Sequence, residues 1–360
     1  MSVDEVQKKY SKRPHRWKII LLTLVAALIL FVILCLNVGF APISFSDIMT
    51  IIGKQVPFLN QYINPSSVSV VNEAIILQIR LPRILAGAIV GAGLAAAGVM
   101  YQGIFRNPMA DSYLLGASAG ASFGYTLAVL YGGTLAANIL GMGLFQVVAF
   151  FGAVLTVFLV YFMSRVGNKV PITTLLLSGI VVNIFILSLQ TVFELRSGQA
   201  LMGIVAWIAG GFTNITWTSI YTVFPVVLVG TVLAYFFTKD LNLLSMGDDT
   251  AQHLGVNTER VRQILLLLSS LVTAAVVSIS GVIGFVGLII PHMTRLIIGP
   301  DHRILLPTSA IVGAIFLILC DSLARVATGA SELPVGVITA LAGTPFFIYL
   351  LRKRKTSYSL

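Results

Sequence analysis

The stretch that decides the fold is residues 80–124, RLPRILAGAIVGAGLAAAGVMYQGIFRNPMADSYLLGASAGASFG. It contains two uncharged runs, separated by the polar segment 106–111. Each run is long enough to cross a bilayer, since about 20 apolar residues suffice. Small residues recur at every fourth position, a spacing that lets helix backbones approach closely within lipid; they are Gly87, Gly91 and Ala95 in the first run and Gly116, Gly120 and Gly124 in the second. We predict two transmembrane helices buried among others, with Arg80 and Arg83 at one mouth.

The composition extends this prediction to the whole chain. Hydrophobic residues make up 57% and charged residues 10%, against roughly 25% charged in soluble domains. We predict an all-α polytopic membrane protein with about ten crossings, at 19–40, 84–105, 113–131, 142–164, 172–193, 218–238, 263–280, 283–297, 304–321 and 334–351. Residues 1–18 form an N-terminal arm, 19–351 the transmembrane domain and 352–360 a tail.

Three polar or irregular segments interrupt the crossings. Segment 41–79 is predicted as a loop with a surface helix at 46–53, and segment 194–217 as a loop with a short interfacial or re-entrant helix. The largest polar segment, 239–262, has the layout of a short helix, a glycine turn and a second helix. With ten alternating crossings, the five crossings of the first half and the five of the second would run in opposite senses, as in an inverted repeat.

The distribution of basic residues predicts the orientation. If the N-terminus is cytoplasmic, 18 of the 23 Lys and Arg residues lie inside and five lie outside, which the positive-inside rule favours. Both termini are then cytoplasmic, and basic loops facing anionic lipid explain the net charge of +10 without nucleic acid. The five outer cations are Lys54, Arg80, Arg83, Arg196 and Arg325. Two alternatives stay open for those at helix ends: snorkelling to headgroups, or a cationic rim that receives an acidic partner.

Several kinds of chemistry find no support in the sequence. The glycine-rich runs carry no lysine where a phosphate-binding loop needs one, and no His, Cys, Asp or Glu cluster has metal-ligand spacing. We therefore expect no cofactor and no metal site. An ion relay would need ionisable residues in mid-membrane, and the candidates Asp321 and Glu332 fall near outer helix ends beside Arg325. Energy for uphill transport would have to come from another subunit.

Several motifs, in order, resemble the FecCD-type permeases. These are Ile79-Arg-Leu-Pro-Arg, Gln102-x3-Arg-Asn-Pro-x-Ala-Asp, Leu115-Gly-x-Ser-x-Gly, Gly284-Phe-x-Gly-Leu-x2-Pro-His-x2-Arg, Asp301-His-Arg-x-Leu-Leu-Pro and Glu332-Leu-Pro-x-Gly-x2-Thr. The family comprises membrane subunits of ABC importers for iron-siderophores, haem and cobalamin, with the type II importer fold of two inverted five-helix halves. The resemblance implies a transport subunit of the cell membrane that is not itself an enzyme, with iron-siderophore as first cargo and cobalamin or haem as alternatives.

The resemblance also implies partners and sites. The partners are a second permease subunit (the same or a different chain), two cytoplasmic ABC ATPases that hydrolyse ATP, and an extracellular or periplasmic substrate-binding protein. Arg80, Arg83 and Arg325 match the family's arginines that receive glutamates of the binding protein. The segment after the sixth crossing matches the coupling helices that seat in the ATPase, with five candidate contacts: Asp248, Asp249, His253, Gly255 and Glu259. An ordinary solvated loop is the alternative for this segment.

The family's cytoplasmic gate lies before a Leu-Leu-Leu-x-Gly motif, found here at 175–179, and falls on Ile172 and Thr173. Family gate residues are small hydroxyls, from which Ile172 departs. Asn183 either faces the pore or bonds a neighbouring helix. Two rival functions remain: an ion-driven secondary carrier, and an intramembrane enzyme acting on lipid, which would need a catalytic constellation of carboxylates or histidines.

Overall fold

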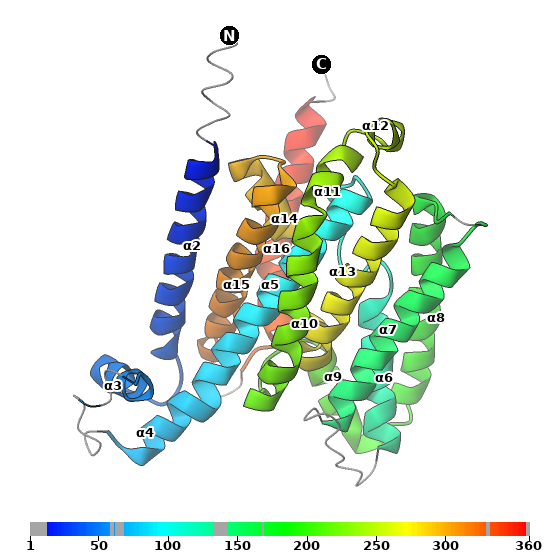
Figure 1. Ribbon diagram of the computed structural model, residues 1–360. Helices are drawn as coiled ribbons and strands as arrows, with labels where there is room; N and C mark the ends of the chain where they lie inside the picture. The colour runs from blue at the N-terminus through cyan, green and yellow to red at the C-terminus, as the bar shows by residue number, and fades with distance from the viewer. Residues whose placement is uncertain are drawn as a thin grey trace.

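The computed structural model describes residues 13–57, 61, 68–132, 143–167, 169–328 and 332–357. Long helices run side by side between two ends of the molecule (Figure 1). Ten of the described helices form the bundle: α2 (Arg13–Leu36), α5 (Leu81–Ile104), α6 (Ala117–Tyr131), α7 (Leu144–Ser164), α8 (Ile172–Glu194), α10 (Trp217–Phe236), α13 (Thr258–Ser280), α14 (Val286–Ile298), α15 (His302–Val326) and α16 (Val335–Ser357). The predicted ten crossings and the all-helical fold are confirmed.

Short helices mark the two ends of the bundle. α11 (Thr238–Leu244) and α12 (Asp248–His253) lie at the end where α2 begins and α16 ends, which we call the α12 end. α3 (Phe45–Gln55), α4 (Val70–Ala74) and α9 (Leu201–Ile208) lie at the opposite end, the α3 end (Figure 1). In the first half, α2 and α5–α8, the first helix starts from the α12 end and the following helices alternate in direction. In the second half, α10 and α13–α16, the first helix starts from the α3 end and the following helices again alternate. These are the two inverted five-helix halves.

Seven of the described helices are long and apolar enough to cross a membrane by themselves. The shorter bundle helices have local causes. α6 begins at 117 instead of the predicted 113 because Gly116, at φ 83°, ends the preceding turn in a left-handed conformation. α14 has 13 residues because an irregular segment, bounded by Gly281 at φ 65° and Phe285 at φ 71°, precedes it.

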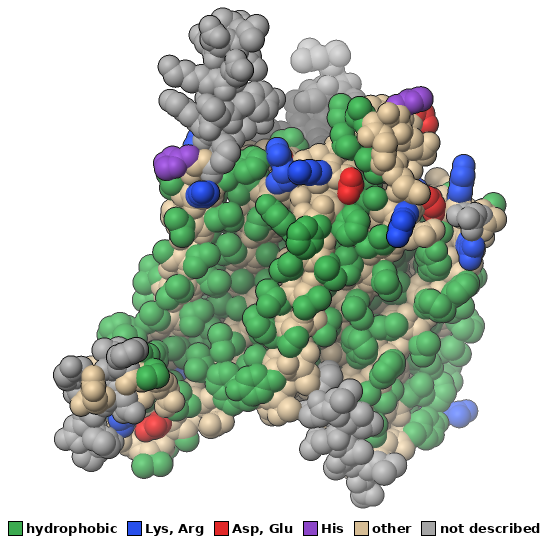
Figure 2. Space-filling view, viewed as in Figure 1, with side chains coloured by type: hydrophobic (Ala, Val, Ile, Leu, Met, Phe, Trp, Pro, Cys, Tyr) green, Lys and Arg blue, Asp and Glu red, His purple; other side chains and the backbone are tan. Residues whose placement is uncertain are grey.

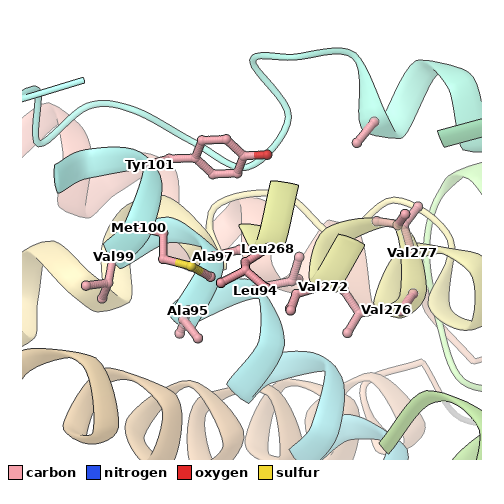
Figure 3. Close-up of a cluster of buried hydrophobic side chains, with 14 of the residues drawn as sticks. Leu94, Ala95, Ala97, Val99, Met100, Tyr101, Leu268, Val272, Val276 and Val277 are labelled. Atoms are coloured by element: carbon pink, nitrogen blue, oxygen red, sulfur yellow. The ribbon is translucent and has the colours of Figure 1, made fainter. Parts of the chain in front are cut away.

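The buried centre of the bundle is α5 packed against α15, α13 and α14. Figure 3 shows Leu94 of α5 beside Val272 and Val276 of α13, in a cluster closed to solvent. The small-residue stripe of α5 serves this packing: a Cβ on Gly91 would collide with the backbone carbonyl of Gly313 in α15. The second stripe works likewise, with Gly120 of α6 against the backbone of α7.

The helix that carries the Arg-Leu-Pro-Arg motif is longer than predicted. It runs without a break from α4 through the π-helical turn η3 (Ile75–Arg80) into α5, so that residues 70–104 form one rod. The sequence suggests a start near residue 84 because the uncharged run begins there, just after Pro82 and Arg83. The π-helical turn explains how Pro82 fits. Proline has no backbone N–H to donate, and the local change of hydrogen-bond register means that no donor is required at this position.

Candidate functional site

Three arginines meet at the α3 end, in what we call the arginine pocket. Arg80, Arg83 and Arg325 line a cavity of about 260 Å³ together with Glu332 and apolar residues that include Phe40 and Ile79. The arginines come from adjoining helices, Arg80 at the end of the π-helical turn, Arg83 in α5 and Arg325 near the end of α15. The prediction that these three residues gather at one end of the molecule therefore agrees with the geometry.

The arginines do not form the exposed rim that the sequence suggested. Their exposed fractions are 4% for Arg80, 8% for Arg83 and 4% for Arg325. Arg80 donates to the carbonyls of Leu36 (2.7 Å) and Ala41 (2.6 Å). Neither snorkelling nor a free rim describes this arrangement, because the guanidinium groups point into the protein, where carbonyls and carboxylates satisfy them.

The other two arginines share one buried carboxylate. Asp321 of α15 lies 2.9 Å from Nε of Arg83 and 3.3 Å from Nε of Arg325. Arg83 also donates to Glu332 at 2.7 Å, and Arg325 to the carbonyl of Val38 at 2.8 Å. The Asp321 side chain is 1% exposed, whereas Glu332 is 32% exposed. Three cations face two carboxylates, so the arginine pocket keeps one excess positive charge.

Arg80 and Arg325 also hold the end of α2. The carbonyls they bind, of residues 35–41, belong to the last turn of α2 and the bend after it. The last carbonyls of a helix have no partners within the helix, and cationic side chains stabilise that end. This role could not be predicted from the sequence, because the contacts join residues about 40 and 290 positions apart.

At the α12 end, α11, α12 and the first turn of α13 form a protruding segment, residues 239–262, which we call the coupling segment after the role that its motif predicts. Asp248 begins α12 and accepts from Nη2 of Arg262 at 3.1 Å and of Arg106 at 3.3 Å. Asp249 and His253 are exposed, and so is Gly255, whose φ of 86° makes a left-handed turn. Two large apolar side chains are also exposed on it, Met246 at 64% and Leu254 at 58%.

The coupling segment is tied to two other helices. The side-chain amide of Asn242, in α11, contacts the start of α15. Its Nδ2 donates to the carboxylate of Asp301, and its Oδ1 accepts from the backbone N–H of His302, both at 2.9 Å. Burial opposes ionisation of Asp301, but hydrogen bonds from Arg303 and Asn242 outweigh it and lower its pKa to about 2. Glu259 accepts from the backbone N–H of Val170 at 2.9 Å, two residues before α8.

The candidate gate residues occupy the first turn of α8. Ile172 is half-buried and Thr173 is exposed. Thr173 begins an exposed apolar stripe that continues along α8 through Leu177, Ile180, Val181 and Ile184. Asn183 lies on a different face, where its amide donates to the carbonyl of Tyr113 at 3.4 Å and so holds the segment before α6.

Between its two polar ends the molecule is covered by hydrophobic side chains. Figure 2 shows charged side chains concentrated at the α12 end and a broad hydrophobic belt below them. Among the described residues no group of three or more His, Cys, Asp or Glu side chains is arranged to hold a metal ion.

Comparison with known proteins identifies the family. The FecCD transport family model matches residues 27–353. The chain belongs to this family. It is 42% identical over 283 residues to the cobalamin import system permease of Halobacterium salinarum, covering 79% of this chain and 74% of the relative. It is 38% identical over 284 residues to an iron(3+)-hydroxamate import permease of Bacillus subtilis, covering 78% and 72%.

A solved structure agrees with this assignment. A metal-chelate type ABC transporter in an inward-facing conformation matches with a TM-score of 0.79 at 32% identity, over 93% of this chain and 99% of that chain. This FecCD-family chain is thus a multi-pass membrane protein and a transport subunit, with the type II importer permease fold that the motifs predicted.

The motif resemblance found the residues at both ends of this FecCD-family chain but missed the ties between them. Arg262 and Asn242, which anchor the coupling segment, were not singled out, and Arg106 was quoted in a motif without a role. Asp111, quoted in the same motif, was also given no role. It accepts from the backbone N–H and hydroxyl of Ser112, beside Gly287 in the first turn of α14, where a carboxylate complements the helix dipole. A motif identifies such residues, but the pairing depends on the fold.

Proposed function

We propose that this chain is the permease subunit of an ABC importer that moves a metal chelate across the cytoplasmic membrane, with ATP hydrolysed by partner subunits. The observation that carries the proposal is the FecCD family match across residues 27–353. The fold supports it, because a bundle of alternating helices with an inverted repeat is suited to alternating access. The apolar and small polar faces of its helices would hold cargo weakly, which favours release.

The orientation proposed for the chain places both termini and the α12 end in the cytoplasm. Support comes from the described basic residues at that end, which are Arg16, Lys18, Arg106, Arg165, Lys169, Lys239, Arg260, Arg262, Arg295 and Arg303. The α3 end carries Lys54, Arg80, Arg83, Arg196 and Arg325. The excess of cations at the α12 end agrees with the positive-inside rule. Domain limits of 19–351, with cytoplasmic extensions on either side, follow from this orientation.

The arginine pocket is proposed as the docking site of the external binding protein. Its excess positive charge and its cavity of about 260 Å³ suit one incoming carboxylate, and the exposed side chains of Phe40 and Ile79 would surround it. An entering acidic side chain would compete with Glu332 for Arg83, since Glu332 is the more exposed of the two resident acids. Ion pairs at such a site set encounter rate and register more than affinity.

A crosslink tests this docking while keeping the two buried ion pairs of Asp321. Glu332→Cys leaves Arg83 paired with Asp321, and disulfide formation with cysteines placed at acidic positions of the binding protein should be efficient. Ser46→Cys on α3 provides the control at the same end. Equal crosslinking at both positions, or none at position 332, would contradict docking at the arginine pocket.

The coupling segment is proposed as the seat of the ATPase. Met246 and Leu254 are apolar, exposed and outside the bilayer-spanning part, which is typical of a protein interface, and Asp249, His253 and Gly255 lie beside them. The two charge contacts of Asp248 would make the segment a rigid lever. Glu259 would carry its movement to the backbone of Val170 and so to the start of α8, where Ile172 and Thr173 are the proposed gate. The proposed pore role of Asn183 is weaker, given its bond to Tyr113.

The assembly proposed from the family has two permease subunits, two ATPases and one binding protein. The exposed stripe of α8 is a surface that a second permease subunit would cover, so that the pathway lies between the two copies. No nucleic-acid partner is proposed, because the basic residues follow the membrane polarity described above.

Within the metal chelates we propose ferric siderophore as first cargo, with cobalamin and haem as alternatives. Identities of 42% and 38% to permeases for cobalamin and for iron(3+)-hydroxamate differ too little to choose between them. Uptake of labelled ferric hydroxamate and labelled cobalamin, in a strain lacking this chain and in the complemented strain, decides the cargo. Complementation that restores neither of these, nor the uptake of labelled haem, with the ATPase and binding protein present, would refute the metal-chelate importer.

An ion-driven secondary carrier is the nearest rival. Asp321 and Glu332 are both paired with arginine near the α3 end, which leaves them unsuited to carry a proton or Na⁺ across. Uptake that continues when the ATPase is inactivated and stops when the ion gradient is collapsed would favour the rival.

A further inference from the structure

A crevice opens between the first half of α2 and the helices α14 and α15, at the α12 end. Its volume is about 750 Å³, within the range of pockets that hold small molecules. Apolar side chains form most of its walls, among them Ile20 and Leu24 of α2, Ile297 of α14 and Val312 of α15. α2 packs on α15 and α5 but stands apart from α14 at this end (Figure 1), so the crevice faces the surrounding bilayer.

The mouth of the crevice is cationic. Arg16 lines it, is exposed, and pairs with no carboxylate among the described residues. Arg303 stacks over the ring of Trp17 at 5.2 Å and is paired with Asp301 at 2.6 Å. Two cations therefore meet one carboxylate, and one positive charge is left for an anionic group at the depth of the headgroups.

A buried hydroxyl lies deeper in the same crevice. Thr308 of α15 lines the wall, is 2% exposed, and its Oγ1 has no hydrogen-bond partner among the described residues. Since α15 begins at His302, a rise of 1.5 Å per residue places Thr308 about 9 Å below the mouth. The interfacial layer on each side of a bilayer is about 5–8 Å thick, so this depth corresponds to the ester carbonyls of a glycerophospholipid.

We propose that the crevice is a binding site for one anionic glycerophospholipid of the adjacent leaflet. Its phosphate would meet Arg16, and Thr308 would donate to an ester carbonyl. An acyl chain would lie along Ile20, Leu24 and Ile297. Trp17 lies at the mouth, where aromatic residues are favoured at the membrane interface. Basic pockets between transmembrane helices on the cytoplasmic side are suited to such headgroups. The site is independent of the cargo and of the proposed transport function.

Native mass spectrometry of the purified full-length chain, exchanged into nanodiscs of phosphatidylglycerol and phosphatidylcholine in equal amounts, tests the site. We expect preferential retention of one phosphatidylglycerol. A phosphate contact near the surface is worth about 1 kcal/mol per cation, or roughly fivefold in affinity. Arg16→Gln should reduce the retention about fivefold, and Thr23→Trp, at an exposed position of the crevice wall, should abolish it by filling the space.

Arg165→Gln is the matched control, because Arg165 is exposed at the α12 end but follows α7, on the other side of the bundle. It should retain phosphatidylglycerol like the unmodified chain. A photoactivatable phosphatidylglycerol should crosslink to residues of α2 or α14 near the crevice. The proposal is overturned by equal retention of both lipids, by the same loss in Arg165→Gln as in Arg16→Gln, or by crosslinks confined to other helices.

Discussion

Replacing Asp321 by Asn should destabilise the protein more than any other single change of an acidic residue at the α3 end. Asp321 is the shared partner of Arg83 and Arg325, and its side chain is 1% exposed. Loss of its charge leaves two buried guanidinium groups with Glu332 as the remaining carboxylate. Removing one partner of a buried ion pair costs about 3–5 kcal/mol, whereas Glu332→Gln at a third-exposed position should cost about 1 kcal/mol or less.

Equilibrium unfolding in mixed detergent and SDS micelles, followed by tryptophan fluorescence, measures both variants. A loss of about 3 kcal/mol corresponds to a more than hundredfold change in the unfolding equilibrium constant. Asp249→Asn, exposed at the α12 end, controls for the loss of one negative charge and should leave the transition in place. If Asp321→Asn unfolds with the midpoint of Asp249→Asn, the buried ion-pair network does not stabilise the fold and the reasoning fails.

Three further predictions concern packing and coupling. Gly91→Ala should destabilise by about 1–3 kcal/mol because a Cβ meets the backbone of α15, while Gly203→Ala in α9, with open space around it, should be neutral or stabilising in the same unfolding assay. Gly255→Val should strain the left-handed turn by about 1–2 kcal/mol and lower ATP-dependent uptake. Gly255→Asn should retain uptake, because asparagine tolerates that conformation. Equal uptake in both variants would exclude the turn from the coupling mechanism. Glu259→Ala removes the acceptor of the buried N–H of Val170 and should uncouple hydrolysis from uptake in proteoliposomes. Glu259→Gln keeps an acceptor and should lose less; equal loss in both variants would show that the charge, not the hydrogen bond, matters.

The helices of this protein could be predicted from the sequence because lipid imposes a simple rule. Every backbone polar group in the bilayer must be satisfied within the segment, so an apolar run long enough to cross is a helix. The same rule explains the largest error in helix length. The start near residue 84 was set by the uncharged run that follows Arg83, but the helix extends back through Pro82 and the π-helical turn at residues 75–80 to residue 70. No feature of residues 70–80 alone indicates that change of register.

The burial of the arginine pocket could not be predicted in the same way. Charge counting placed Arg80, Arg83 and Arg325 at one end, and the family motifs selected the same three residues. Whether a guanidinium faces solvent or carbonyls depends on where α2 ends, and that contact joins α5 and α15 to a helix far away in sequence. Asp321 was recognised as lying beside Arg325, one helical turn away, but its bond to Arg83 crosses 238 positions.

The distribution of close backbone contacts suggests which parts of the bundle move together. α5 and α15 meet through Gly91 and Gly313, where neither backbone can shift without the other, and the pair of Arg83 with Asp321 locks them at the α3 end. α8 packs only on α6 and α7 among the bundle helices with extensive contacts. Its first turn is joined to the coupling segment by the bond of Glu259 to the backbone just before it. A displacement of the coupling segment therefore meets little resistance from α8 and much from the α5–α15 pair. We expect α8 to move relative to a fixed α5–α15 pair when access changes. Distances between spin labels, measured by double electron–electron resonance, should then stay constant from α5 to α15 through the ATPase cycle and change from α5 to α8.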